Sequence, residues 1–139
     1  MKQSDLFYLV KADAEDQLMK NPRILRILMG NEYIQIDFGY VAPWIYNRGG
    51  WIRIAPHTHI QVQGSKKKYA LREAKNIPLA PEQFNFESTE DWRVFSLLFE
   101  PIPLKDCVID IIEEEEPNSD DFNFYNIKLE DITHMQLVV

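Results

Sequence analysis

Hydrophobic residues recur at every second position along much of the chain after Pro22. In residues 34–40 the apolar or aromatic side chains occupy the even positions, and polar residues or glycine occupy the odd ones. Because side chains of a strand point alternately to its two faces, this pattern predicts a β-strand with one buried face. The apolar run 23–29 comes just before, and Gly30-Asn31 is a turn pair. The two runs are therefore predicted to be adjacent antiparallel strands.

The same reasoning predicts further short strands separated by turn residues. They cover residues 51–55, 58–62, 67–71, 92–100, 106–112 and 122–129. The sequence Gln63-Gly64-Ser65-Lys66 is typical of a tight turn and predicts a hairpin on either side of it. Residues 76–91 contain Pro78 and Pro81 and are predicted to be a long connection that crosses from one sheet to another.

Only one segment favours a helix. Residues 13–20 are rich in helix formers, with acidic side chains in the first turn and Lys20 in the last, and Asn21-Pro22 supplies a stop. We therefore expect an N-terminal segment, residues 1–22, with one short helix, followed by a single β-sandwich domain, residues 23–139. The predicted fold is an all-β, antiparallel, immunoglobulin-like sandwich of about eight strands.

Composition supports one folded domain and does not identify a reaction. The chain has 139 residues, of which 45% are hydrophobic, and a formal net charge of −7. Residues 1–80 carry 12 basic and 7 acidic side chains, whereas residues 81–139 carry 3 and 15. This asymmetry indicates a basic nucleic-acid-binding face, an acidic tail, or strands of the two halves that interleave and bring opposite charges together. We interpret it as two solvated patches on one domain. The single cysteine, Cys107, excludes an intramolecular disulfide and is expected to be a buried structural thiol.

The order of several short motifs resembles that of a known family. The matching residues are Trp51, Ile52, Ile54, Pro56, Thr58, Tyr69, Leu71, Ile77-Pro78-Leu79, Pro81-Glu82, Phe95, Leu97, Phe99-Glu100-Pro101, Pro103, Asp110-Ile111-Ile112-Glu113, Asn123-Phe124-Tyr125, Ile127 and Leu129. Together they resemble an uncharacterised β-sandwich domain of bacterial envelope proteins, sometimes found ahead of thioredoxin-like modules. The resemblance covers residues 50–130 and implies a periplasmic or cell-envelope protein. No signal peptide or transmembrane stretch is visible, so the expected location is cytoplasmic if the chain as given is complete.

His57-Thr58-His59 is the sharpest chemical motif. Residues two apart in an extended segment share a face, so both imidazoles are candidate ligands of one divalent metal. The third histidine, His134, has no predicted position relative to them. The alternative is a solvent-exposed turn at Pro56-His57, with no metal.

Three other groups are candidate binding sites. Glu113 to Glu116 and Asp120-Asp121 form either a loose cation site or, as we prefer, a solvated hairpin loop. The basic residues 66–68, Arg72 and Lys75 are interpreted as a like-charged hairpin or a partner for that acidic loop. The aromatic residues Trp44, Tyr46 and Trp51 are candidates for stacking on a sugar or anchoring a protein, or they close one end of the core.

These features favour a non-catalytic domain that mediates binding or assembly. No nucleophile elbow or phosphate-cradling glycine loop is present in the sequence, and no cofactor is implied. The expected partner is another protein or a glycan, and an overall pI near 4.9 disfavours nucleic acid. The alternatives are a small metal-dependent enzyme using His57 and His59, or a carbohydrate-binding module.

Overall fold

The computed structural model shows an all-β chain, described for residues 7–13, 21–42, 50–87, 91–116, 121–130 and 136–138. The strands are β1 (Phe7–Asp13), β2 (Arg23–Gly30), β3 (Ile34–Val41), β4 (Trp51–Ile52), β5 (His59–Val62), β6 (Lys68–Lys75), β7 (Phe84–Asn85), β8 (Trp92–Phe99), β9 (Cys107–Ile112), β10 (Phe124–Glu130) and β11 (Gln136–Val138). The all-β prediction is therefore confirmed.

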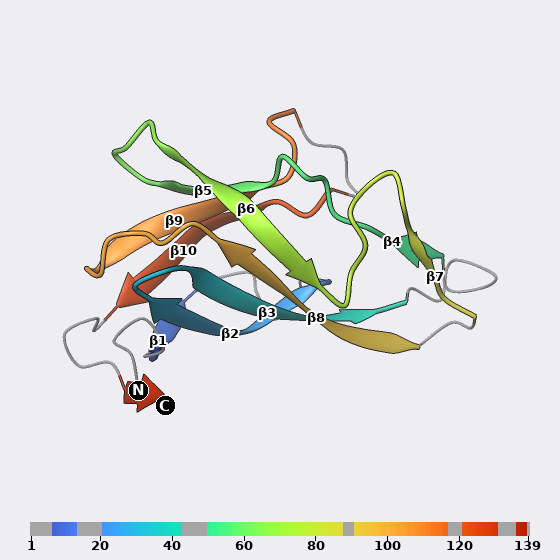
Figure 1. Ribbon diagram of the computed structural model, residues 1–139, viewed down its shortest axis with the longest axis horizontal. Helices are drawn as coiled ribbons and strands as arrows, with labels where there is room; N and C mark the ends of the chain where they lie inside the picture. Colours follow the sequence, from blue (N-terminus) through green and yellow to red (C-terminus); the bar gives the residue numbers. More distant parts are fainter. Residues whose placement is uncertain are drawn as a thin grey trace.

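Nine of these strands form one antiparallel sheet that curls on itself. Its order is β10-β9-β5-β6-β8-β3-β2-β1-β11, and β1 also pairs with β10. In Figure 1 the layer of β5, β9 and β10 lies above that of β2, β3 and β8. Strands β4 and β7 form a separate two-stranded sheet at one end. An immunoglobulin-like sandwich is not confirmed, because β6 pairs directly with β8 and makes the two layers one continuous sheet.

Most predicted strands and their neighbours are confirmed. Strands β2 and β3 pair antiparallel, and β5 and β6 form the expected hairpin around Gly64, whose φ of +88° suits a residue without a side chain. The connection after β6 does not cross between sheets as predicted, since β6 and β8 are neighbours. The segment 51–55 is a strand only at Trp51–Ile52.

The predicted N-terminal helix is not seen. Asp13 is the last residue of β1, and the rest of the expected helix, residues 14–20, lies outside the described residues. Strand β1 pairs with both β2 and β10, so this part of the N-terminal segment belongs to the curled sheet. Within the ranges that the structure describes, there is no helix of the length and apolar character needed to cross a membrane.

The core fills the space between the two layers. Phe38 on β3 stacks on Phe95 of β8, with ring centroids 5.1 Å apart, and its centroid lies 5.4 Å from that of Phe124 on β10. Phe38 and Phe95 are cross-strand partners within one layer, and the contact between Phe38 and Phe124 joins the two layers of the curled sheet. The inward prediction for Phe95, Leu97 and Phe99 is confirmed, since each is almost fully buried.

Candidate binding surface and polar cluster

The outer face of β2, β3 and β8 carries a row of exposed apolar side chains. Leu25, Val41, Trp92 and Val94 are 51%, 50%, 67% and 39% exposed, and we call these four residues the outer stripe. They point away from the core, because their strand neighbours Tyr40, Phe95 and Ile24 are buried.

Strand register makes the outer stripe contiguous. Val41 pairs with Trp92, and Gly39 pairs with Val94 on the next row of the same face. Leu25 lies over Gly39, where its Cδ atoms are 3.5 Å from the position that a Cβ would occupy. The glycine therefore leaves room for Leu25 to bridge from β2 toward β8, and the four side chains form one surface.

An acidic residue of β3, Asp37, lies beside the outer stripe on the same face of the sheet. Asp37 is 6% exposed and accepts hydrogen bonds from Arg26 Nε, from Ser96 Oγ at 2.6 Å and from Gln35 Nε2 at 2.9 Å. Burial raises the pKa of Asp37, but these hydrogen bonds and the charge of Arg26 outweigh it, so the pKa lies below its ordinary value. Asp37 is thus an ionised anchor between β2, β3 and β8.

Polar groups also gather at the start of β5, opposite the end of β9. The buried Glu113 accepts a hydrogen bond from the Ala55 amide at 2.9 Å and another from the Phe122 amide at 2.8 Å. Burial raises the pKa of Glu113, and these two amides offset part of that rise. One carboxylate therefore joins the segment before β5, the end of β9 and the segment before β10.

Asn123 completes this connection. Its Oδ1 accepts from the amides of Glu113 and Glu114 at 2.8 and 3.1 Å, and its Nδ2 donates to the Glu114 carbonyl at 2.7 Å. Asn123 is itself 4% exposed. The backbone that carries Glu114 is consequently held in a fixed place.

The two histidines of the motif differ in their surroundings. His57 is exposed, and its Nε2 lies 2.9 Å from Glu114 Oε1. His59 is 7% exposed, and its Nδ1 lies 3.3 Å from the His57 carbonyl oxygen. The Nε2 of His59 is buried and has no hydrogen-bond partner among the described residues.

The remaining side chains of the acidic segment Glu113–Glu116 face solvent. Lys68 Nζ donates to Glu115 Oε1 at 2.6 Å, and this hydrogen bond is the main reason why the pKa of Glu115 is lowered. The prediction that the basic hairpin is a partner for the acidic loop is therefore confirmed at Lys68. The prediction of a solvated loop is wrong at Glu113. This side chain is buried and accepts hydrogen bonds from two backbone amides.

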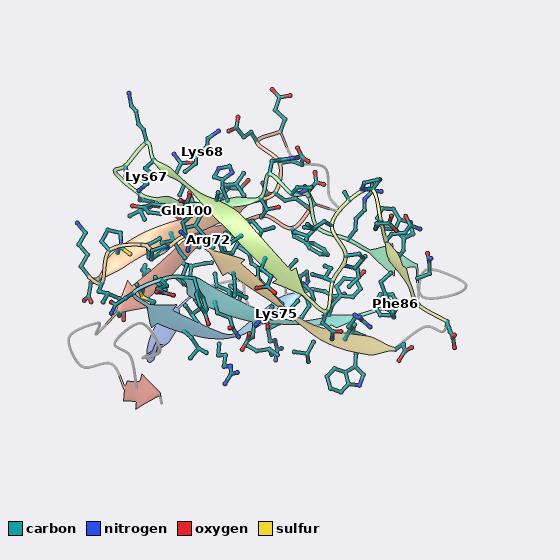
Figure 2. The ribbon with its side chains drawn as sticks, viewed as in Figure 1. Lys67, Lys68, Arg72, Lys75, Phe86 and Glu100 are labelled. Atoms are coloured by element: carbon teal, nitrogen blue, oxygen red, sulfur yellow. The ribbon has the colours of Figure 1, made fainter. Side chains whose placement is uncertain are left out.

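The other basic side chains do not converge on one point. Figure 2 shows Lys67 and Lys68 at the hairpin end of β6, with Arg72 and Lys75 farther along that strand. Lys67 Nζ lies 4.7 Å from the Tyr69 ring centroid, and Arg72 donates to the Glu32 carbonyl oxygen. The cations are spread over the hairpin and β6, and Lys67, Lys68 and Arg72 already contact groups of this chain.

The predicted aromatic site is only partly described. Trp44 and Tyr46 lie outside the described residues, as does His134. Trp51 is 48% exposed, and the Arg53 guanidinium carbon lies 4.8 Å from its ring centroid. A glycan site at these aromatics stays a prediction. Cys107 was predicted to be buried but is only half-buried, where it packs against the core and burial raises the pKa of its thiol.

The outer stripe was not singled out from the sequence, although a signal was present. In residues 92–99 the inward residues occupy odd positions, so Trp92 and Val94 fall on the outward face. Val41 likewise follows an inward series on even positions. An apolar residue out of phase with a strand's buried face is the pattern that identifies such a surface.

Comparisons with protein-family models, curated proteins and solved structures found no match to this chain.

Proposed function

We propose that this chain is a non-catalytic binding or assembly domain, and that it binds another protein through the outer stripe. The observation that carries the proposal is the contiguous exposure of Leu25, Val41, Trp92 and Val94 on a regular sheet face. Exposed apolar surface costs free energy in water, and covering it with a partner recovers about 25 cal/mol per Å².

The composition of the stripe supports a protein partner. Tryptophan is enriched at the centres of protein interfaces, where it supplies a large apolar area with few rotatable bonds. Trp92 is the most exposed of the large hydrophobic residues that the structure describes. Its cross-strand neighbour Val41 and the adjacent Val94 provide the flat aliphatic surroundings in which such a residue packs.

The three strands that carry the stripe are joined along their length. Strand β3 lies between β2 and β8 with a register that is continuous from Ile34 to Val41 against β8. Asp37, held by Arg26 and Ser96, ties all three strands together beside the stripe. A preorganised surface loses little conformational entropy on binding, which favours association.

The test is a size measurement on wild type and on the double variant Trp92→Ser/Val94→Ser. Sedimentation velocity is measured for the purified chain and for the tagged chain in an extract of its native host. We expect the wild type to sediment faster than a monomer in at least one of these samples, and the double variant to sediment as a monomer in both.

The matched control is Leu104→Ser, which removes an exposed leucine, 43% exposed, from the connection between β8 and β9. It should behave as the wild type. A wild-type chain that is monomeric in both samples, or a complex that survives the double substitution, contradicts the proposal.

A further inference from the structure

We propose that the small sheet of β4 and β7 binds a neutral saccharide, with a sugar ring stacked on Trp51 and its hydroxyls bound by Asn85 and Gln83. The site uses none of the residues of the outer stripe, so it is independent of the protein-binding role proposed above. It extends the expectation of a sugar at Trp51 by naming the polar side chains that surround the ring.

The first observation is that this sheet has one face on the core and one face in solvent. Ile52 is 2% exposed, and its cross-strand partner Phe84 packs against Phe86, with ring centroids 5.1 Å apart. On the next cross-strand pair, Trp51 is 48% exposed and Asn85 is exposed as well. Alternation therefore presents Trp51 and Asn85 together on the outer face, at one end of the molecule (Figure 1).

The second observation is the pair of amide side chains beside the ring. Gln83 is two residues before Asn85, and its Nε2 donates to Asn85 Oδ1 at 2.9 Å. This bond does not use the Asn85 Nδ2 donor or the Gln83 Oε1 acceptor. A donor and an acceptor held side by side match two neighbouring hydroxyl groups of a sugar.

The third observation is the position of Arg53, which holds the indole. Its guanidinium carbon lies 4.8 Å from the centroid of the Trp51 ring, and its Nη1 lies 3.4 Å from the Pro81 carbonyl oxygen. The half-exposed ring still offers surface to a ligand beside this cation. A ring that already has a packing partner loses less side-chain freedom on binding.

The chemistry of this surface fits a sugar better than it fits a protein. The faces of a pyranose with equatorial hydroxyls consist of C–H groups, which the electron-rich face of an indole attracts, and its edge consists of hydroxyls. Trp92 has aliphatic neighbours, as the centre of a protein interface requires, whereas Trp51 has amide and guanidinium neighbours. An aromatic platform with polar groups at its edge is the complement of a sugar ring.

The charges near the site favour a neutral saccharide. Glu82 and Glu87 are exposed on either side of β7 in the sequence and repel an anionic ligand. Arg53 is the cation that contacts the ring, and it lies against Trp51 and Pro81. Hydrogen bonding by the two amides, which carry no charge, is therefore expected to orient the sugar.

The experiment is a titration of the isotope-labelled chain with cellohexaose, chitohexaose and xylohexaose, three neutral saccharides with equatorial hydroxyls, followed by two-dimensional NMR. The indole N–H signal of Trp51 is identified by its loss in Trp51→Ala. With at least one of the three we expect this signal to shift in a saturable way, with a Kd of about 1 mM or tighter. Absence of a saturable shift with all three overturns the proposal.

Variants then locate the bound sugar. Trp51→Ala, observed at the backbone amide of Asn85, should weaken binding by about tenfold or more. Asn85→Ala and Gln83→Ala should each weaken it by about threefold, because each removes a hydrogen-bonding group.

The matched control is Tyr125→Ala, which removes an aromatic ring of 50% exposure from β10 and should bind as the wild type does. The same spectra report whether each variant is folded, and the two amide variants at exposed positions keep the test decisive if Trp51→Ala is not. Binding that is unchanged in the folded site variants, or that falls equally in Tyr125→Ala, contradicts a saccharide site at Trp51.

Discussion

At the scale of single residues, Asp37 shows how a polar group is retained near the interior of the sheet. Its carboxylate is almost fully buried but accepts hydrogen bonds from three side chains, one of them the cationic Arg26. A buried charge without such partners would be strongly destabilising. The residue therefore contributes to stability only while it is ionised.

Stability should accordingly depend on the protonation of Asp37. Because its folded-state pKa lies below the ordinary value of 3.8, its contribution is present above that pH and is lost as the pH falls through the folded-state pKa. Asp37→Asn should lower the free energy of unfolding at neutral pH by about 1–3 kcal/mol. It should also flatten the loss of stability in acid. Urea unfolding at pH 7 and at a series of pH values below 3.8 measures both.

The control for this substitution is Glu82→Gln, which neutralises an exposed carboxylate. We expect little change from it at any of these pH values. Equal effects of Asp37→Asn and Glu82→Gln would show that Asp37 is not a specific anchor.

At the scale of elements, the two faces of β8 have different roles. Phe95 is 1% exposed and stacks on Phe38, whereas its neighbour Val94 is 39% exposed on the outer stripe. Alternation along the strand places the core on one side and the proposed binding surface on the other.

Adjacent substitutions should therefore differ sharply. Phe95→Ala should lower the free energy of unfolding by about 3–5 kcal/mol, because it leaves a cavity between the layers. Val94→Ala should change it by no more than about 0.5 kcal/mol. Chemical denaturation of both variants checks this, and a large loss in Val94→Ala would place that residue in the core.

The pattern of apolar and polar residues predicted the positions of the strands better than it predicted how the strands pair. Alternation located β3, β5 and β8, and short apolar or aromatic runs bounded by turn residues located β2, β9 and β10. Neither pattern predicted the β6–β8 pairing or the closure of β1 on β10. Those pairings depend on long-range packing, which the period of two does not encode.

The candidate sites follow the same rule. The spacing of His57 and His59 was visible in the sequence, but Glu114 lies beside His57 only because β5 pairs with β9, placing His59 opposite Ile112. The outer stripe likewise depends on the registers of three strands. The sequence shows which side chains could act in a site, and the pairing of the strands determines which of them lie together.

At the scale of the whole molecule, the uneven charge of the two halves does not produce two separate charged lobes. Lys68 from the basic half pairs with Glu115 from the acidic half, and His57 meets Glu114. The interleaved strand order brings these segments together. Because opposite charges are neighbours there, the proposed partner-binding surface is the apolar outer stripe and not a charged patch.

The most direct test measures whether this stripe is covered in the native setting. In a Cys107→Ala background, Val94→Cys places one thiol on the stripe and Lys67→Cys places one on the exposed β5–β6 hairpin as a control. Labelling rates with a maleimide are compared between the purified, dilute protein and an extract of the native host. We predict that Val94→Cys reacts more slowly in the extract by about tenfold while Lys67→Cys is unchanged. Equal rates for Val94→Cys in the two samples would contradict a binding role for this face.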